Sequence, residues 1–268
     1  MFNIGLVLCR KSKFPHFIGQ CSFRAVTHVI FDLDGTILDS ETLYELMYNK
    51  ILRKYGKEFN KEVRTAITGT NEQYASRKVV EMLELPITPE QYWKEIEELG
   101  RIHLTNPGVK PGAERLIMHL SEKKVPLAIA TSGSLKGFKL KSRGRPDLFA
   151  HFHHIVHGSS DPEVINGKPA PDIFLVAARR FPVPADPKKC LVFEDAPNGL
   201  RGAVDAGMQV VMVPEYDWAK EDVQDAALIL KSLEEFVPEQ FGLPGYPTNS
   251  PENLLKTNAA KPSDKVVH

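Results

Sequence analysis

Four short apolar runs place the strongest constraint on how this chain can fold. Each run is continuously apolar, which is typical of strands that are buried on both faces of a parallel sheet. The runs are His28–Asp32, Pro126–Thr131, Cys190–Glu194 and Gln209–Val213. Amphipathic stretches near residues 112–123, 171–181 and 197–206 lie between them and predict helices. This alternation predicts an α/β fold built on a Rossmann-like parallel sheet.

Residues 41–106 interrupt the alternation, because no convincing strand pattern occurs among them. Apolar residues recur there at helical spacing, at Leu43, Leu46, Met47 and Leu52. Farther along, Thr88 followed by Pro89 and Gln91 predicts a capped helix start, with proline at the first helical position. We therefore expect a small all-helical cap domain at 41–106, inserted after the first strand of a discontinuous core at 27–40 and 107–242.

The two ends of the chain differ from this middle part. Residues 1–26 form a basic extension that carries Arg10, Lys11, Lys13 and Arg24 and no acidic residue. Such a start is typical of a mitochondrial transit peptide, and an unstructured extension on a cytoplasmic protein is the reading that we favour. Residues 243–268 contain four prolines among polar residues and predict a disordered tail.

Composition excludes several classes of protein. The 34 Lys and Arg residues equal the 34 Asp and Glu residues, so bulk electrostatics do not favour a nucleic-acid partner. No apolar run approaches the roughly 20 residues that span a membrane. The three scattered cysteines favour a reducing compartment and exclude a disulfide scaffold and a cysteine-based zinc site. The oligomeric state stays open.

Acidic side chains follow two of the predicted strands. Asp32 and Asp34 end the first run, and Glu194 and Asp195 end the third. Carboxylates so close to buried strands repel one another unless a cation or a shared proton offsets their charge. A solvated turn at Asp34 and a helix N-cap at Asp195 are the structural alternatives.

Hydroxyl groups and a lysine complete the set. Thr131 and Ser132 end the second run before a predicted helix, where hydroxyls and free backbone N–H groups can bind an anion. Lys168 lies on a stiff turn between Gly167 and Pro169. An ordinary loop and a surface lysine are the alternatives.

The four motifs in this order resemble the haloacid dehalogenase superfamily over nearly all of residues 27–242. Within it, several segments look very like the animal pseudouridine-5′-phosphatases. These segments are Phe31–Asp39, Gly167–Leu175, Cys190–Gly199 and Ala206–Pro214. The resemblance implies an enzyme, a phosphoric monoester hydrolase that acts on a small phosphorylated sugar or nucleoside, with pseudouridine 5′-phosphate as the specific candidate.

The resemblance also implies a role for each motif residue. Asp32 is expected to be the nucleophile that forms an aspartyl-phosphate, and Asp34 the general acid and base. Thr131, Ser132 and Lys168 are expected to bind the phosphoryl oxygens. Mg²⁺ is the expected cofactor. Its ligands would be the Asp32 carboxylate, the Asp34 backbone carbonyl and Asp195, with Glu194 reaching it through water.

The cap is expected to select the substrate. Where these phosphatases would carry Met-Gly-Lys-Lys, this chain has Thr68, Gly69, Thr70 and Asn71, so a substrate-facing lysine is absent from that position. Gly69, Thr70 and Asn71 are therefore the candidate specificity residues. Two alternatives use the same fold, namely a phosphoglucomutase-type phosphotransferase and a catalytically idle regulatory protein.

Overall fold

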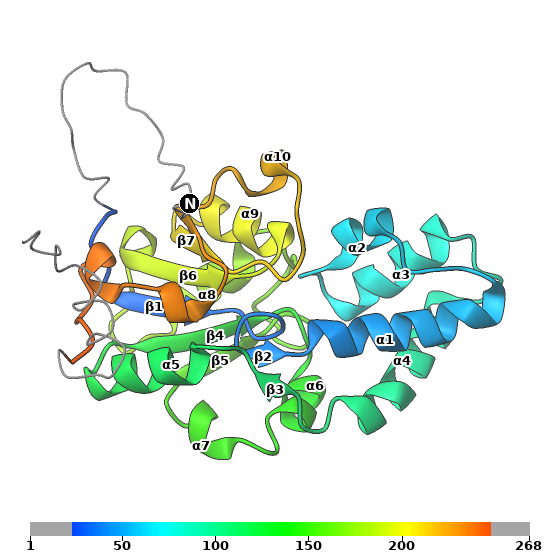
Figure 1. Ribbon diagram of the computed structural model, residues 1–268, viewed down its shortest axis with the longest axis horizontal. Helices are drawn as coiled ribbons and strands as arrows, with labels where there is room; N and C mark the ends of the chain where they lie inside the picture. The colour runs from blue at the N-terminus through cyan, green and yellow to red at the C-terminus, as the bar shows by residue number, and fades with distance from the viewer. Residues whose placement is uncertain (1–22, 248–268) are drawn as a thin grey trace, which may run out of the picture.

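The computed structural model describes residues 23–247, and a six-stranded parallel sheet forms its centre (Figure 1). The strand order is β5-β4-β1-β6-β7-β8. The strands are β1 (His28–Phe31), β4 (Leu127–Thr131), β5 (His154–His157), β6 (Cys190–Glu194), β7 (Gln209–Met212) and β8 (Leu228–Ile229). The four apolar runs are therefore confirmed as strands, and the predicted parallel sheet with them.

Both faces of the sheet are buried, which explains why the runs are continuously apolar. In β1, Val29 and Phe31 belong to the core on one face, and Ile30 belongs to the core on the other. The first core packs against α5 (Ala113–Glu122), α7 (Pro146–Phe149), η3 (Leu233–Glu235) and η4 (Pro238–Phe241). The second packs against α8 (Asp172–Arg179) and α9 (Pro197–Asp205). The short elements α6 (Leu135–Lys141), η2 (Pro187–Lys189) and α10 (Lys220–Val223) complete this part.

A helical body with its own core lies beside the carboxyl ends of the strands (Figure 1). Its elements are α1 (Glu41–Leu52), η1 (Arg53–Tyr55), α2 (Lys61–Ile67), α3 (Glu72–Met82) and α4 (Pro89–His103). Met47, Ile51 and Tyr92 are fully buried in it. Leu46, which we expected on the apolar face of the first helix, is 48% exposed, because α1 packs through the stripe that contains Met47 and Ile51.

A helix cap lies within this body, and a two-stranded ribbon lies at its junction with the sheet part. Thr88 Oγ1 accepts a hydrogen bond from the backbone N–H of Gln91 at 3.2 Å, and Gln91 Oε1 accepts one from the backbone N–H of Thr88 at 2.8 Å, which confirms the predicted start of α4. An antiparallel ribbon of β2 (Leu38–Asp39) and β3 (Gly108–Val109) joins the segment that leaves the sheet to the segment that returns to it.

The predicted extension and tail are described in part. Phe23 stacks on Phe241 with ring centroids 4.2 Å apart, and residues 1–22 lie outside the described range. Leu243, at the start of the predicted tail, is buried in the core, whereas residues 248–268 lie outside the description. Within residues 23–247, no helix is long and apolar enough to cross a membrane.

Two glycines in the sheet part have the same backbone conformation but different surroundings. Gly112 and Gly207 have φ angles of +82° and +83°. A Cβ on Gly112 would lie 2.6 Å from the carbonyl carbon of Leu233, whereas a Cβ on Gly207 would meet nothing within 4 Å.

We expect Gly207→Ala to lower the free energy of unfolding by about 1 kcal/mol, because a side chain is strained at positive φ. Gly112→Ala should cost about 1–3 kcal/mol more, because the backbone around Leu233 must also move. Urea unfolding of both variants measures the difference. Equal losses would show that the contact with Leu233 relaxes freely.

Candidate active site

The carboxyl ends of three neighbouring strands bring the predicted residues together. Phe31 of β1 pairs with Ile129 of β4 on one side and with Phe193 of β6 on the other. The backbone N–H of Asp32 still donates to the carbonyl of Phe193 at 2.9 Å, so the pairing continues to the end of β1. Asp32, Thr131 and Glu194 consequently lie at one edge of the sheet, as the parallel arrangement requires.

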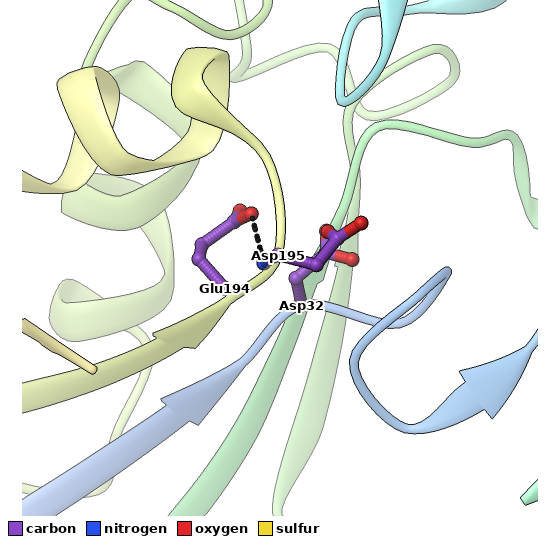
Figure 2. Close-up of side chains that lie close together, drawn as sticks. All are labelled: Asp32, Glu194 and Asp195. Carbon is purple, nitrogen blue, oxygen red and sulfur yellow. Dashed lines mark hydrogen bonds between the residues drawn. The ribbon is translucent and has the colours of Figure 1, made fainter. Parts of the chain in front are cut away.

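Three carboxylates at this edge of the sheet form a compact cluster (Figure 2). One oxygen each from Asp32, Glu194 and Asp195 lies within 4.8 Å of the other two, and all three residues are buried. Burial is the main reason that the pKa of Asp32 rises to about 7, and the neighbouring Glu194 and Asp34 raise it further. So much negative charge away from water needs positive charge nearby.

Lys168 supplies part of that charge. Its ammonium is fully buried and donates to Asp32 Oδ1 at 2.5 Å, to Glu194 Oε1 at 2.6 Å and to the Ala130 carbonyl at 3.0 Å. Burial lowers the pKa of Lys168, but the two carboxylates outweigh burial and raise it above its usual value. The turn that carries Lys168 therefore fixes a permanent positive charge behind Asp32.

A divalent cation fits the other side of the cluster. Asp195 Oδ2 is buried, and nothing in residues 23–247 gives it a hydrogen bond. Burial raises the pKa of Asp195 well above its usual value, and Glu41, Glu194 and Asp32 add to the rise. A Cβ on Gly35 would lie 2.6 Å from Asp195 Cγ, so glycine leaves this carboxylate its space. Buried carboxylate oxygens are the hard donors that Mg²⁺ and similar ions prefer.

Asp34 lies at the mouth of the site and is held through both of its carboxylate oxygens. Ser40 donates to Oδ1 at 2.6 Å, and Lys141 donates to Oδ2. The sequence reasoning missed both partners. Lys136 and Lys139 of the same short helix are exposed at positions i and i+3, whereas Lys141 lies off their face. This difference in spacing is a weak sequence signal that Lys141 is buried.

The loop after β4 contacts the helical body. Ser132 Oγ donates to the carbonyl of Gly69 at 2.7 Å, while Thr131 Oγ1 accepts from the backbone N–H of Gly133 at 3.2 Å. Asn198 of α9 donates to the Thr68 carbonyl at 2.8 Å. Backbone carbonyls at the start of the predicted specificity segment are therefore bound by the sheet part.

A cavity of about 80 Å³ lies between the two parts. Asp32, Asp34, Thr131 and Ser132 line it from the sheet side. From the helical side it is lined by Gly69 and Thr70 and by the aromatic residues Tyr44, Tyr48, Tyr92 and Trp93. Asn71, the third predicted specificity residue, lines a neighbouring groove and caps α3, where its side chain accepts from Tyr74 N at 2.8 Å.

Two further acids near the cavity were not predicted. The carboxylate of Glu72 accepts from the backbone N–H and the hydroxyl of Ser134, both at 3.1 Å. Burial raises the pKa of Glu72. Burial is also the main reason that the pKa of Glu41 rises to about 8, with Asp34 and Asp32 adding to the effect. Both acids line the cavity, so it combines aromatic walls with carboxyl groups.

The site combines a candidate nucleophile with fixed charges. Asp32 has a buried ammonium on one side and faces a covered cavity on the other. A second carboxyl group, on Asp34, lines the same cavity. Such a set can attack an electrophilic centre, move a proton and stabilise negative charge.

Known proteins resemble the chain across this region. A family model described as haloacid dehalogenase-like hydrolase matches residues 26–207. A probable pseudouridine-5′-phosphatase of Drosophila melanogaster is 48% identical over 223 residues, which cover 83% of this chain and 96% of that protein. The (DL)-glycerol-3-phosphatase 2 of Arabidopsis thaliana is 42% identical over 227 residues, which cover 83% of this chain and 93% of that protein. The crystal structure of CbbY from Rhodobacter sphaeroides in complex with phosphate superposes with a TM-score of 0.65 at 26% identity. The superposition covers 78% of this chain and 96% of that chain.

Replacing Asp195 should separate stability from ion binding. In the absence of divalent ions, we expect Asp195→Asn to raise the free energy of unfolding at neutral pH by about 1–3 kcal/mol, because a buried carboxylate without a partner is removed. The raised pKa gives the sign, since the carboxyl group costs no stability below its ordinary pKa, and the penalty grows as the pH rises from there toward the raised pKa.

The stabilisation of the wild type by Mg²⁺ should disappear in the same variant. Thermal unfolding with and without the ion measures both effects. Asp205→Asn, an exposed position on α9, is the matched control and should change neither. Loss of stability in Asp195→Asn without the ion would contradict the assignment of this carboxylate to a cation site.

Proposed function

The chain belongs to the haloacid dehalogenase-like hydrolase family and is a phosphoric monoester hydrolase, and we propose that it works through an aspartyl-phosphate on Asp32. The observation that carries this proposal is the position of Asp32. Its carboxylate contacts the Lys168 ammonium at 2.5 Å and lines the covered cavity. The lysine keeps positive charge beside the nucleophile and beside the phosphoryl group that it attacks.

Two steps complete the reaction. In the first, an Asp32 oxygen bonds to phosphorus, the bond from phosphorus to the leaving oxygen breaks, and that oxygen takes a proton from Asp34. In the second, water attacks phosphorus, Asp34 takes a proton from the water, and Asp32 is released with inorganic phosphate. Thr131 and Ser132, at the end of β4, are the proposed ligands of the phosphoryl oxygens, together with Lys168.

A divalent cation belongs to this site, and we assign it as Mg²⁺. Asp32 and Asp195 would hold it directly, with the Asp34 backbone carbonyl, and Glu194 would act through water. When bound, the ion offsets the negative charge of the carboxylates and of the phosphate. The unpartnered Asp195 oxygen and the all-oxygen donor set support this assignment.

The helical segment 41–106 is the proposed cap, which covers the leaving group of the substrate. Its residues Gly69 and Thr70 line the cavity beside the aromatic side chains of Tyr44 and Trp93. Aromatic walls suit the base of a nucleoside, because rings stack on them. With the 48% identity to the Drosophila relative, this favours pseudouridine 5′-phosphate as the substrate.

Asp32→Asn tests the nucleophile. We expect phosphate release to fall by a factor on the order of a thousand or more, because an amide cannot form the acyl phosphate. Chelation should abolish the activity of the wild type, and added Mg²⁺ should restore it. Asp147→Asn, an exposed position on α7, is the control that should keep full activity. An Asp32→Asn enzyme as active as the wild type would refute the mechanism.

A substrate panel tests the specificity. Pseudouridine 5′-phosphate and uridine 5′-phosphate share the ribose and the phosphate, so a preference between them must arise from contacts with the base. We expect kcat/KM to favour pseudouridine 5′-phosphate by at least about tenfold, or about 1.4 kcal/mol.

DL-glycerol 3-phosphate and glucose 1-phosphate complete the panel. Faster hydrolysis of glycerol 3-phosphate would replace the nucleotide by a polyol phosphate as the substrate. Isomerised sugar phosphate without free phosphate would favour the phosphoglucomutase-type reaction. Phosphate release from no member of the panel would leave the idle regulatory protein as the better reading.

A further inference from the structure

Each aspartate of the Asp32-Leu33-Asp34 motif contacts a different buried lysine. Lys168 contacts Asp32 from the turn before α8, and Lys141 contacts Asp34 from the last residue of α6. The proposed mechanism uses Lys168 but gives Lys141 no task. A second buried ammonium at the same site therefore calls for a physical explanation.

Lys141 joins three separate parts of the molecule. Its ammonium donates to Asp34 Oδ2 in the loop after β1 and to the hydroxyl of Tyr44 in α1 at 3.3 Å. It also lies 5.5 Å from the centroid of the Tyr44 ring. Asp34 and Tyr44 both line the cavity. Lys141 therefore lies where α6, the loop after β1 and the helical body meet.

The burial of the pair is unequal, which argues against a purely structural ion pair. The Lys141 side chain is 2% exposed, whereas the Asp34 side chain is 19% exposed. Asp34 thus keeps contact with the solvent and does not require a buried partner to offset its charge. An apolar residue at position 141 would pack at less cost than a desolvated ammonium, unless the ammonium serves the carboxylate that it contacts.

The two contacts of Asp34 also restrict its orientation. Ser40 holds Oδ1 at 2.6 Å while Lys141 holds Oδ2, so the carboxyl plane is set from both ends. A proton donor must lie within hydrogen-bond reach of the oxygen that it protonates, and small displacements of such groups slow a reaction steeply.

From this geometry we propose that Lys141 is a positioning residue, which with Ser40 holds the Asp34 carboxyl toward the leaving oxygen of the substrate. The inference rests on the proposed function, because it assigns Lys141 to the proton-transfer step of that mechanism. It predicts that the loss of Lys141 lowers kcat/KM most for substrates whose leaving oxygen needs a proton.

Two substrates that differ in this need provide the test. An alkyl phosphate leaves as an alkoxide that must be protonated, whereas p-nitrophenyl phosphate releases a stable phenolate without a proton. The quantity to measure is kcat/KM, since it reports on the steps up to departure of the leaving group. DL-glycerol 3-phosphate or pseudouridine 5′-phosphate, whichever the wild type hydrolyses faster, serves as the alkyl phosphate.

In Lys141→Met we expect kcat/KM for the alkyl phosphate to fall at least about tenfold more than kcat/KM for p-nitrophenyl phosphate. Lys141→Arg, which keeps a cationic donor, should recover part of the selective loss. Lys139→Met, an exposed lysine on the same helix, is the matched control and should change neither value. Equal losses on both substrates in Lys141→Met would overturn the proposal, because a merely structural role affects both alike.

Ser40→Ala keeps the test decisive if Lys141→Met does not fold. It removes the other contact to Asp34, leaves the lysine in place and should show a selective loss in the same direction. Unchanged selectivity in Ser40→Ala, with the wild type active on both substrates, would refute the positioning role and leave the phosphatase proposal standing. A wild type that hydrolyses neither substrate would instead refute the proposed function.

Discussion

The contact between the Lys168 ammonium and the carboxylates of Asp32 and Glu194 is the interaction on which the site depends. The parallel sheet forces the ends of β1 and β6 together, which places acidic groups side by side in a buried position. Without a fixed cation, the like charges would drive protonation or local rearrangement. The buried lysine thereby allows the strands to keep the register that brings Asp32 to the sheet edge.

The cavity exists only where two independently packed parts meet. The sheet and the helical body each have their own core, and polar contacts join them around the cavity. Ser132 and Asn198 bind backbone carbonyls of the helical body, while Lys141 bonds to the Tyr44 hydroxyl. These contacts help to bury Asp32 and Thr131, and in a drier environment the fixed charges act more strongly.

Local patterns predicted some site residues and missed others for one physical reason. Asp32, Thr131 and Glu194 directly follow or end apolar strands, so their place at the sheet edge follows from the strand pattern. Lys141 ends a helix of seven residues that carries two exposed lysines, and its burial depends on a loop and a helix far away in the chain. Glu72 is similar, because its partner Ser134 lies 62 positions away in the chain. Ser40 lies only six residues after Asp34, but no apolar periodicity or strand end marks it.

The sequence by itself determined the parallel sheet, the helical segment at 41–106, the acidic and hydroxyl groups at the strand ends and the stiff turn that carries Lys168. These features are written in local periodicity and in neighbouring residues, which the backbone must satisfy wherever the rest of the chain lies. Only the tertiary structure decided that Lys168 contacts Asp32 and Glu194, that Lys141 and Ser40 hold Asp34, and which residues of the helical body face the cavity. The two lysine contacts join residues 107 and 136 positions apart, so they arise from the packing of whole elements and leave no local pattern to read.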